Sequence, residues 1–308
     1  MRLVILVVCF STLFINEMAA QSSAKDTSSY LFYEPPGLMP KVFAPGIIST
    51  SNLYEFGIAF SETADRVYYA VKLNDEWKAE IRYVELRNGR WSKSQKLELN
   101  DKYSYNDPYL SYDEHRLYFI SNRPLGGEGE TKDSDLWYIE KKENGWSRPI
   151  GVSEVVNTGK DEFYISLTRS GTLYFASNAH TSTEDKWDFD IYYAKSKKGE
   201  FQEPVRMGDS INSIDFECDA FVSPDESYMI FCSTRAGGQG EGDLYISFKN
   251  SANKWTKAMN MGEHINTKTH DFCPFVTQDG KYLFYTSNED IYWVDATIIV
   301  DLREKYGQ

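Results

Sequence analysis

The sequence predicts an all-β protein in which five blades of four antiparallel strands close into a propeller. A unit of about 55 residues recurs five times along the 308-residue chain. Each unit contains short runs of Tyr, Phe, Ile, Leu and Val bounded by Gly, Asn, Asp and Ser, which is typical of strands. The fifth unit lacks its last strand, and a matching segment stands near the N-terminus. Four strands repeated at this period predict propeller blades.

The repeat is clearest at the turn between the first two strands of each unit. This turn begins at Ser223 and Thr277, and weaker copies begin at Ser61, Ser111 and Leu167. A carboxylate then opens the third strand of all five units: Glu80, Asp135, Asp190, Asp243 and Asp290. Because a catalytic site is rarely fivefold, we expect these carboxylates to make a repeated structural hydrogen bond. The fourth strand opens on an aromatic residue in four units: Trp91, Trp146, Phe201 and Trp255.

The missing fourth strand predicts how the ring closes. Residues 40–49 resemble the fourth-strand segment 204–212. We therefore expect the stretch near Val42 to Gly46 to pair with the strand that starts at Asp290, which removes the exposed sheet edges of an open array. An all-β solenoid and a six-bladed ring are the alternatives, and a sixth blade would have to come from too few leftover residues.

The N-terminus predicts export. Residues 1–20 contain a basic start, an apolar run of about 13 residues and a small-residue exit, which is the pattern of a cleaved signal peptide. The expected organisation is a signal peptide (1–20), a leader (21–39), the propeller (40–297) and a C-terminal tail (298–308). We expect a periplasmic or secreted protein without a membrane span. The net charge of −13 argues against nucleic acid as a partner.

Three cysteines remain after the signal segment, so at least one of them must be unpaired. Cys218 and Cys232 fall on neighbouring predicted strands, where a disulfide is one possibility. Buried free thiols are the other.

Several phrases resemble a known family. Ser223-Pro224-Asp225, the run from Ser121 to Gly127, Asp243-Leu244-Tyr245 and the run from Gly262 to Thr267 resemble WD-like β-propeller repeats of the TolB type, in the form associated with OmpA-like envelope proteins. The resemblance covers roughly residues 40–297. It implies extracytoplasmic binding of envelope proteins or saccharides and supplies no catalytic motif. TolB-like domains usually have six blades, and the five copies here depart from that pattern.

Candidate site residues gather where the first strand of each unit begins, because these strands line the channel of a propeller. Counting back from the turns places the following residues at the channel mouth: Glu55, Tyr105, Asp161, Glu217 and Asp271, and two positions later Gly57, Asp107, Phe163, Asp219 and Cys273. The acids among them can bind a cation, an amine or sugar hydroxyls, or can act as an acid/base pair. They can equally cap turns through backbone N–H groups.

The loops between the second and third strands add Arg123 and Arg235, which can hold a carboxylate or sulfate on a ligand or pair with nearby acids. The four histidines show no metal-binding spacing, and no nucleotide-binding or hydrolase motif precedes a helix. We therefore expect no metal and no cofactor. The function that the sequence favours is binding of an envelope protein or a saccharide at the channel-mouth face. The alternative is a glycoside hydrolase or polysaccharide lyase that uses the mouth carboxylates.

Overall fold

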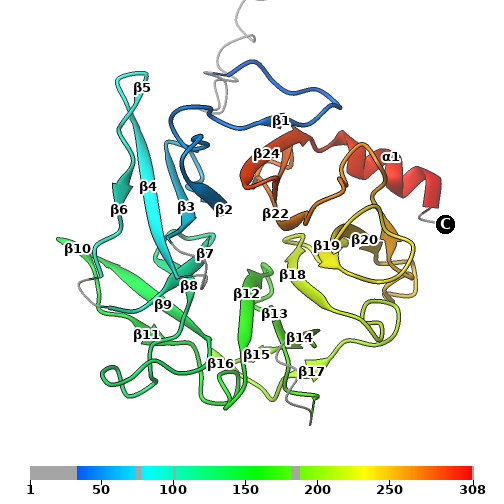
Figure 1. Cartoon of the computed structure of the whole chain (residues 1–308). Helices are drawn as coiled ribbons and strands as arrows, with labels where there is room; N and C mark the ends of the chain where they lie inside the picture. The colour runs from blue at the N-terminus through cyan, green and yellow to red at the C-terminus, as the bar shows by residue number, and fades with distance from the viewer. Residues whose placement is uncertain (1–32, 74–77, 100–101, 182–187, 307–308) are drawn as a thin grey trace, which may run out of the picture.

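The computed structural model describes residues 33–73, 78–99, 102–181 and 188–306, so the predicted signal segment lies outside the described residues. The chain forms five antiparallel sheets arranged as blades around a central axis (Figure 1). The first strands of the five blades surround this axis, and the later strands lie progressively further out. The predicted five-bladed propeller is therefore confirmed.

The first three strands of each blade are β2 (Tyr54–Phe60), β3 (Arg66–Lys72) and β4 (Ala79–Arg87) in blade 1, β7 (Tyr105–Leu110), β8 (Arg116–Ser121) and β9 (Asp135–Lys142) in blade 2, β12 (Glu162–Leu167), β13 (Leu173–Ser177) and β14 (Asp190–Ala194) in blade 3, β18 (Glu217–Val222), β19 (Tyr228–Ser233) and β20 (Asp243–Phe248) in blade 4, and β22 (Phe272–Val276), β23 (Tyr282–Ser287) and β24 (Asp290–Asp295) in blade 5.

The fourth strands are short, and in blades 1 and 2 they are split into two pieces. They are β5 (Arg90–Trp91) with β6 (Gln95–Lys96), β10 (Gly145–Trp146) with β11 (Ile150–Gly151), β17 (Val205–Arg206), β21 (Met259–Asn260) and, in blade 5, β1 (Lys41–Val42). A separate hairpin, β15 (Ser196–Lys197) and β16 (Glu200–Phe201), extends from blade 3.

The N-terminal strand closes the ring as the sequence predicts. β1 pairs antiparallel with β24, with Lys41 opposite Trp293 and Val42 opposite Tyr292. The last blade is therefore completed by residues from the other end of the chain.

Phe43 anchors this closure. Its backbone N–H donates to the carbonyl of Ile291 at 2.7 Å, and its side chain is fully buried. The ring packs edge-on against Phe284 and Trp293, with centroids 4.9 and 5.3 Å away. Such aromatic pairs add to the free energy gained by burial of apolar area.

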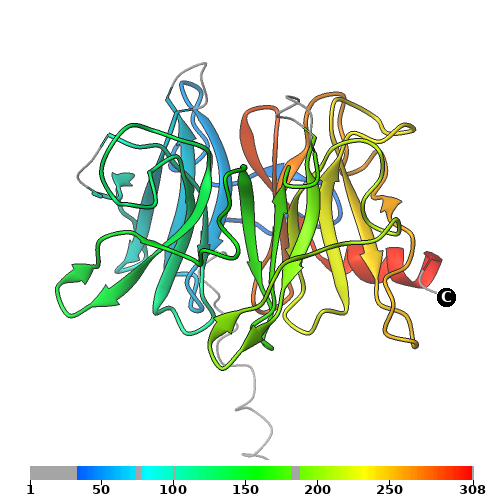
Figure 2. The same ribbon diagram turned by 90° about the horizontal axis from the view of Figure 1, so that it is seen from below.

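Buried apolar side chains fill the space between neighbouring blades. Between blades 1 and 2, for example, Ile81 of β4 belongs to the same cluster as Leu117 and Phe119 of β8. The edge-on view in Figure 2 shows these strands running between the two faces of the ring. This packing holds the blades as one rigid support for the loops on either face.

Helix α1 (Thr297–Tyr306) follows the last strand and lies against the outside of the ring (Figure 2). Ile299 is buried, and the Arg303 guanidinium donates to the Ser227 carbonyl in blade 4 at 2.8 Å. In the described part of the chain, no helix has the length and apolar character needed to cross a membrane.

The cysteines are free thiols. Cys218 and Cys232 lie directly opposite each other on β18 and β19, as the sequence predicts, but no disulfide joins them, and Cys273 is also free. All three are buried. The alternative of buried thiols that pack as small apolar groups is therefore the one the structure contains.

Candidate functional site

One face of the ring collects the segments that the sequence marked as candidates. Because the strands of a blade alternate in direction, the start of the first strand, the loop between the second and third strands and the connection from the preceding blade all lie at the same end. We call this end the mouth face. Arg123 and Arg235 lie in loops of this face, and Glu55, Glu217 and Asp271 lie at the starts of first strands or directly before them.

Each first strand carries a β-bulge just inside the mouth face. The pairing register with the second strand shifts at this point in all five blades. The residue at the shift has a positive φ, between 47° and 55°, in every copy: Gly57, Asp107, Tyr164, Asp219 and Cys273. Four of these five residues are not glycine, and side chains at positive φ are strained. Bulges re-aim side chains, and here they direct polar groups toward the axis.

These polar groups meet across the channel. The Cys273 thiol donates to Asp107 Oδ1 at 3.3 Å, although the two residues belong to blades that are not neighbours in the ring. Tyr164 similarly reaches from blade 3 to blade 5, where its hydroxyl donates to the Pro274 carbonyl at 2.7 Å. The backbone N–H of Cys273 donates to Asp219 Oδ2 at 3.3 Å. Side chains therefore fill the channel at this level.

Asp107 and Asp219 share an unusual electrostatic environment. Burial, together with the nearby charge of Asp219, raises the pKa of Asp107 to about 8. Burial also raises the pKa of Asp219. Because two buried carboxylates near one another cannot both ionise cheaply, Asp107 holds a proton at neutral pH.

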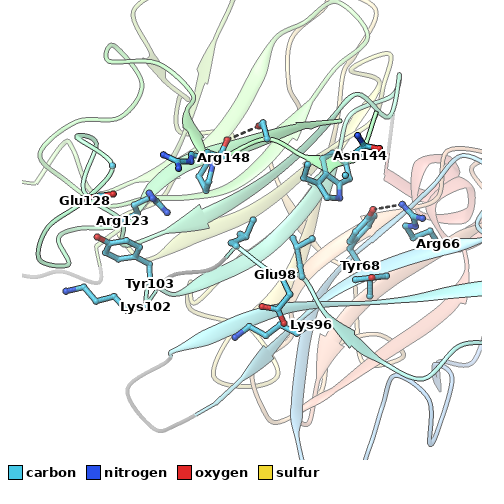
Figure 3. A pocket seen from close by; sticks show the side chains of 18 of the residues that line it. Arg66, Tyr68, Lys96, Glu98, Lys102, Tyr103, Arg123, Glu128, Asn144 and Arg148 are labelled. Carbon is cyan, nitrogen blue, oxygen red and sulfur yellow. Dashed lines mark hydrogen bonds between the residues drawn. The ribbon is translucent and has the colours of Figure 1, made fainter. Parts of the chain in front are cut away.

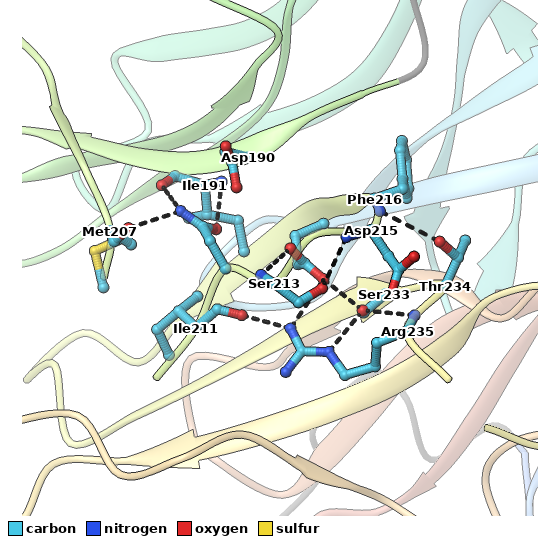
Figure 4. A network of polar contacts seen from close by, with 12 residues as sticks. Asp190, Ile191, Met207, Ile211, Ser213, Asp215, Phe216, Ser233, Thr234 and Arg235 are labelled. Atoms are coloured by element: carbon cyan, nitrogen blue, oxygen red, sulfur yellow. Dashed lines mark hydrogen bonds and ion pairs between the residues drawn. The ribbon is translucent and has the colours of Figure 1, made fainter. Parts of the chain in front are cut away.

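The acids at the mouth positions cap the connections between blades. Glu217 accepts from the N–H of Ser213 at 2.6 Å and from its hydroxyl at 2.7 Å (Figure 4). Asp271 accepts in the same way from the N–H and the hydroxyl of Thr267, at 2.6 and 3.2 Å. Each acid therefore ties its own blade to the connection that enters it. This is the capping arrangement that the sequence left open as an alternative to ligand binding.

The third copy requires a correction of one residue. Glu162, not Asp161, occupies the position of Glu217, because Glu162 lies opposite Ser177 as Glu217 lies opposite Ser233. Glu162 is fully buried. Asp161 lies one residue outside, is half-buried, and accepts from the N–H of Ser134 at 2.8 Å.

The cause of this shift is a shorter turn. The Thr168 N–H donates to the Thr172 carbonyl, four residues on, whereas Ser223 donates to Tyr228, five residues on. Counting back from Leu167 therefore placed the first strand one residue too early, and Tyr164 rather than Phe163 faces the axis. A second signal marks the correct residue: Thr158 precedes Glu162 by four positions, as Ser213 precedes Glu217.

Burial changes the protonation of these capped acids. It raises the pKa of Glu162 to about 8, although the hydrogen bonds from Thr158 and Ser177 oppose the shift. Burial raises the pKa of Glu55 to about 7, and the hydrogen bond from Thr50 again opposes it. For Asp271 the pKa rises to about 6 for the same reason. Acids that are protonated, or whose oxygens already accept hydrogen bonds from the protein, bind a cation weakly.

The two loop arginines bind inward. Arg235 donates to Glu217 Oε1 at 3.0 Å and to the Ser233 hydroxyl at 2.8 Å (Figure 4). Arg123 occupies the same place in blade 2, where Tyr105 replaces the acid, and it donates to the Tyr105 hydroxyl at 3.1 Å. Its guanidinium also lies 5.0 Å from the ring centre of Tyr103. Arg235 therefore pairs with a nearby acid, the second option for these arginines, whereas Arg123 binds a tyrosine hydroxyl in place of an acid.

The recurring third-strand carboxylates do not share one repeated hydrogen bond, and within the described part of the chain Asp135 is held only by an ion pair with Lys132, 3.1 Å away. Asp243 accepts from Asn260 Nδ2 at 2.7 Å, whereas Asp190 accepts from Arg206 Nε at 2.6 Å. His180 Nδ1 also lies 3.0 Å from Asp190. Among the described residues, no group of three or more His, Cys, Asp and Glu side chains is placed to hold a metal ion.

Some aromatic side chains beside the capped acids remain partly exposed. Phe163 and Phe216 are both half-buried, and each packs against the buried Phe189, with ring centres 5.1 and 5.9 Å apart. His270, which directly precedes the mouth acid Asp271, packs on Phe272 with the ring centres 4.8 Å apart. Sequence reasoning placed Phe163 at the channel mouth but did not single out Phe216 or Phe272, although each of the two lies next to a mouth acid.

Comparisons with known proteins support the fold and leave the family open. No protein-family model matches the chain, and no curated protein matches it. Among solved structures, a thermostable family-43 glycoside hydrolase matches with a TM-score of 0.52 and 13% identity, over 80% of this chain and 90% of that one. A protein of unknown function from Dyadobacter fermentans matches with a TM-score of 0.51 and 12% identity, over 85% and 83%. Both likenesses are likenesses of fold.

TolB proteins are also among the structural neighbours. TolB from Acinetobacter baumannii matches with a TM-score of 0.46 and 12% identity. The match covers 80% of this chain and 55% of that TolB, so the chain spans about half of its length.

Proposed function

We propose that this protein is a periplasmic or secreted binding propeller that holds a saccharide or a protein segment on its mouth face without chemical change. The observation that carries the proposal is the contrast at the mouth. The acids there are buried and bonded to the protein, whereas the aromatic rings beside them are partly exposed. Aromatic faces bind the C–H face of a sugar or an apolar side chain and need no charge.

The alternative is a carbohydrate-active enzyme, and one observation favours it. Asp107 and Asp219 lie close together with raised pKa values, which is how an acid/base pair is prepared. Both residues are nearly inaccessible to solvent, however, since Asp107 is only 6% exposed and Asp219 only 7%. A substrate bond must reach a catalytic carboxyl, so this burial favours binding over catalysis.

The test compares two Phe→Ala changes in binding to a panel of neutral and acidic polysaccharides. Phe216→Ala removes a half-buried ring at the mouth, and Phe201→Ala removes a half-buried ring from the outer hairpin of blade 3. We expect Phe216→Ala to weaken binding about tenfold, the scale of one lost aromatic contact, and Phe201→Ala to leave it unchanged. Calorimetry on the purified proteins gives the affinities.

Two results would contradict the proposal. One is equal binding by both variants and the unchanged protein, since the mouth would then be no binding face. The other is release of sugar fragments that disappears in Asp107→Asn or Asp219→Asn, which would establish the enzyme instead.

A further inference from the structure

Three of the connections between neighbouring blades, which we call joints, are fastened by the same Asn side-chain hydrogen bonds. The Asn212 side chain accepts from the Ile191 N–H at 2.9 Å and donates to the Ile191 carbonyl at 3.1 Å, which fastens the connection to the third strand of blade 3. Asn157 binds Leu136 in this way in blade 2. Asn266 does so with Leu244 in blade 4. The next residue is the Thr or Ser that caps the acid of the following blade.

The joint between blades 1 and 2 is built differently. Its connection, from Gln95 to Tyr105, is two residues shorter than the one from Ile150 to Glu162. A tyrosine, Tyr105, replaces the capped acid. Among the described residues of this connection, no Asn side chain binds both the N–H and the carbonyl of one third-strand residue, as Asn157, Asn212 and Asn266 do at the next three joints.

A groove of about 930 Å³ lies at this joint. That volume is within the usual range for a site that encloses a small ligand. Its walls are the outer strands of blade 1, residues 96–99 and 102–103 of the connection, the β8–β9 loop and the β9–β10 turn. A second cavity of about 340 Å³ shares Arg66, Tyr68, Glu85 and Trp146 with the first, so the groove continues past Trp146. The two cavities together extend over parts of blades 1 and 2, as a ligand made of several sugar units requires.

The lining has a charge opposite to that of the whole protein. The chain has 46 acidic and 33 basic residues, but the groove is lined by five cationic side chains and three acidic ones. The cationic ones are Arg66, Lys96, Lys102, Arg123 and Arg148. In a protein of net charge −13, this local excess attracts an anion.

Aromatic rings accompany these cations. Tyr103 and Arg123 lie together at one end of the groove, and Tyr68 and Arg66 lie at the other (Figure 3). Between them Arg148 projects from blade 2 and Lys96 from blade 1. Arg66 is paired with Glu85 and Lys96 with Glu80, and Lys102 lies 3.7 Å from the exposed Glu130. Arg148 is exposed and has no ion-pair partner among the described residues. Arg148 is therefore the cation most available to a ligand.

We infer that this groove is a binding site for an acidic oligosaccharide, whose carboxylate or sulfate groups pair with Arg148 and Lys102 while its sugar rings pack on the tyrosines and Trp146. Guanidinium groups bind carboxylate and sulfate by two parallel hydrogen bonds. The site is distinct from the aromatic rings at the channel mouth, so it can hold whether or not a ligand binds there.

The test is a charge reversal, Arg148→Glu, with titration of oligogalacturonate, a sulfated heparin oligosaccharide, maltoheptaose and oligoglutamate. We expect the unchanged protein to bind one or both acidic sugars but not maltoheptaose. Arg148→Glu should weaken this binding about tenfold or more, and Arg148→Lys should restore part of it. Lys254→Glu, the same reversal at an exposed residue of blade 4, should leave affinity within about twofold, because screening at physiological salt limits its reach.

The thermal midpoints of all variants establish that each is folded. The inference is overturned if neither acidic sugar binds, if Lys254→Glu weakens binding as much as Arg148→Glu, or if oligoglutamate binds as tightly as the sugars. The last result would identify an acidic peptide as the partner. Loss of binding in Phe216→Ala but not in Arg148→Glu would leave the proposed mouth site standing and remove the groove site.

Discussion

At the scale of single residues, the centre of the ring combines backbone strain with buried charge. Asp107 and Asp219 both sit at positive φ, where a side chain other than glycine is unfavourable, and both are nearly inaccessible. Where Gly57 takes this position, an added Cβ would lie 3.0 Å from Asp107 Oδ1. The small residue in blade 1 therefore leaves room for the carboxyl of blade 2. The tight fit explains why Asp107 loses its water and keeps its proton.

The raised pKa of Asp107 predicts a specific pH dependence of stability. Its pKa is about 8 in the folded protein and about 4 in an unfolded chain, so the native state holds a proton that the unfolded state releases between these values. The free energy of unfolding therefore falls as pH rises from about 4 to 8. Asp107→Asn keeps the Oδ1 acceptor and removes the titration. We expect it to be more stable than the unchanged protein at pH 8 by about 1 kcal/mol or more, and similar at pH 4.

Urea unfolding at the two pH values measures this difference. Asp113→Asn is the matched control, because a hydrogen bond from Ser111 lowers the pKa of Asp113 in its exposed turn. This variant should gain no stability at pH 8. If Asp107→Asn is destabilised equally at both pH values, Asp107 is ionised in the native protein and our assignment of its proton is wrong.

At the scale of elements, the strands were predictable and the alignment of one strand was not. Tyr, Phe and Ile runs between turn residues are local signals, and the five copies reinforced one another. The third copy failed because its first turn is one residue shorter, which no strand propensity reveals. The spacing from Thr158 to Glu162 carries the missing information, since it joins a connection to the strand that follows. The partners of the candidate arginines depend on contacts between distant elements and were therefore left open.

The asparagines that bind both the N–H and the carbonyl of one third-strand residue predict how much each connection contributes to the free energy of unfolding. Asn212 is buried and binds the Ile191 N–H and carbonyl as well as the Met207 carbonyl. Asn212→Ala should lower the free energy of unfolding by about 1 to 3 kcal/mol, because it leaves buried backbone groups without partners. Asn144→Ala, in the exposed β9–β10 turn, should change it by less than about 0.5 kcal/mol. Chemical denaturation of both variants measures their free energies of unfolding. Equal values would show that the Asn212 hydrogen bonds are dispensable for stability.

At the scale of the whole molecule, the ring is held closed by residues from both ends of the chain. The sequence predicted this closure because the fifth unit lacks a strand and the N-terminus supplies one. It did not predict the groove, which lies beside a connection two residues shorter than the next one. The described residues of this connection lack an Asn that binds the third strand as Asn157, Asn212 and Asn266 do, and this difference is apparent only from comparison with those three joints. The fold is thus a property of the repeat, whereas the candidate sites arise where copies differ.

Ring closure leads to the last prediction, which concerns truncation from the N-terminus. Removing residues 21–48 deletes β1 and Phe43, so the backbone groups of β24 that pair with β1 become an exposed edge. Exposed edges pair with other chains. We expect this variant to elute from size-exclusion chromatography as oligomers and to lose its sharp thermal transition. Removing residues 21–32 alone keeps β1 and should leave a protein that melts cooperatively. A monomeric, cooperatively melting product of the longer deletion would mean that blades 1 to 4 and the rest of blade 5 hold together without β1, and the closure by the N-terminal strand would then contribute little to the stability of the ring.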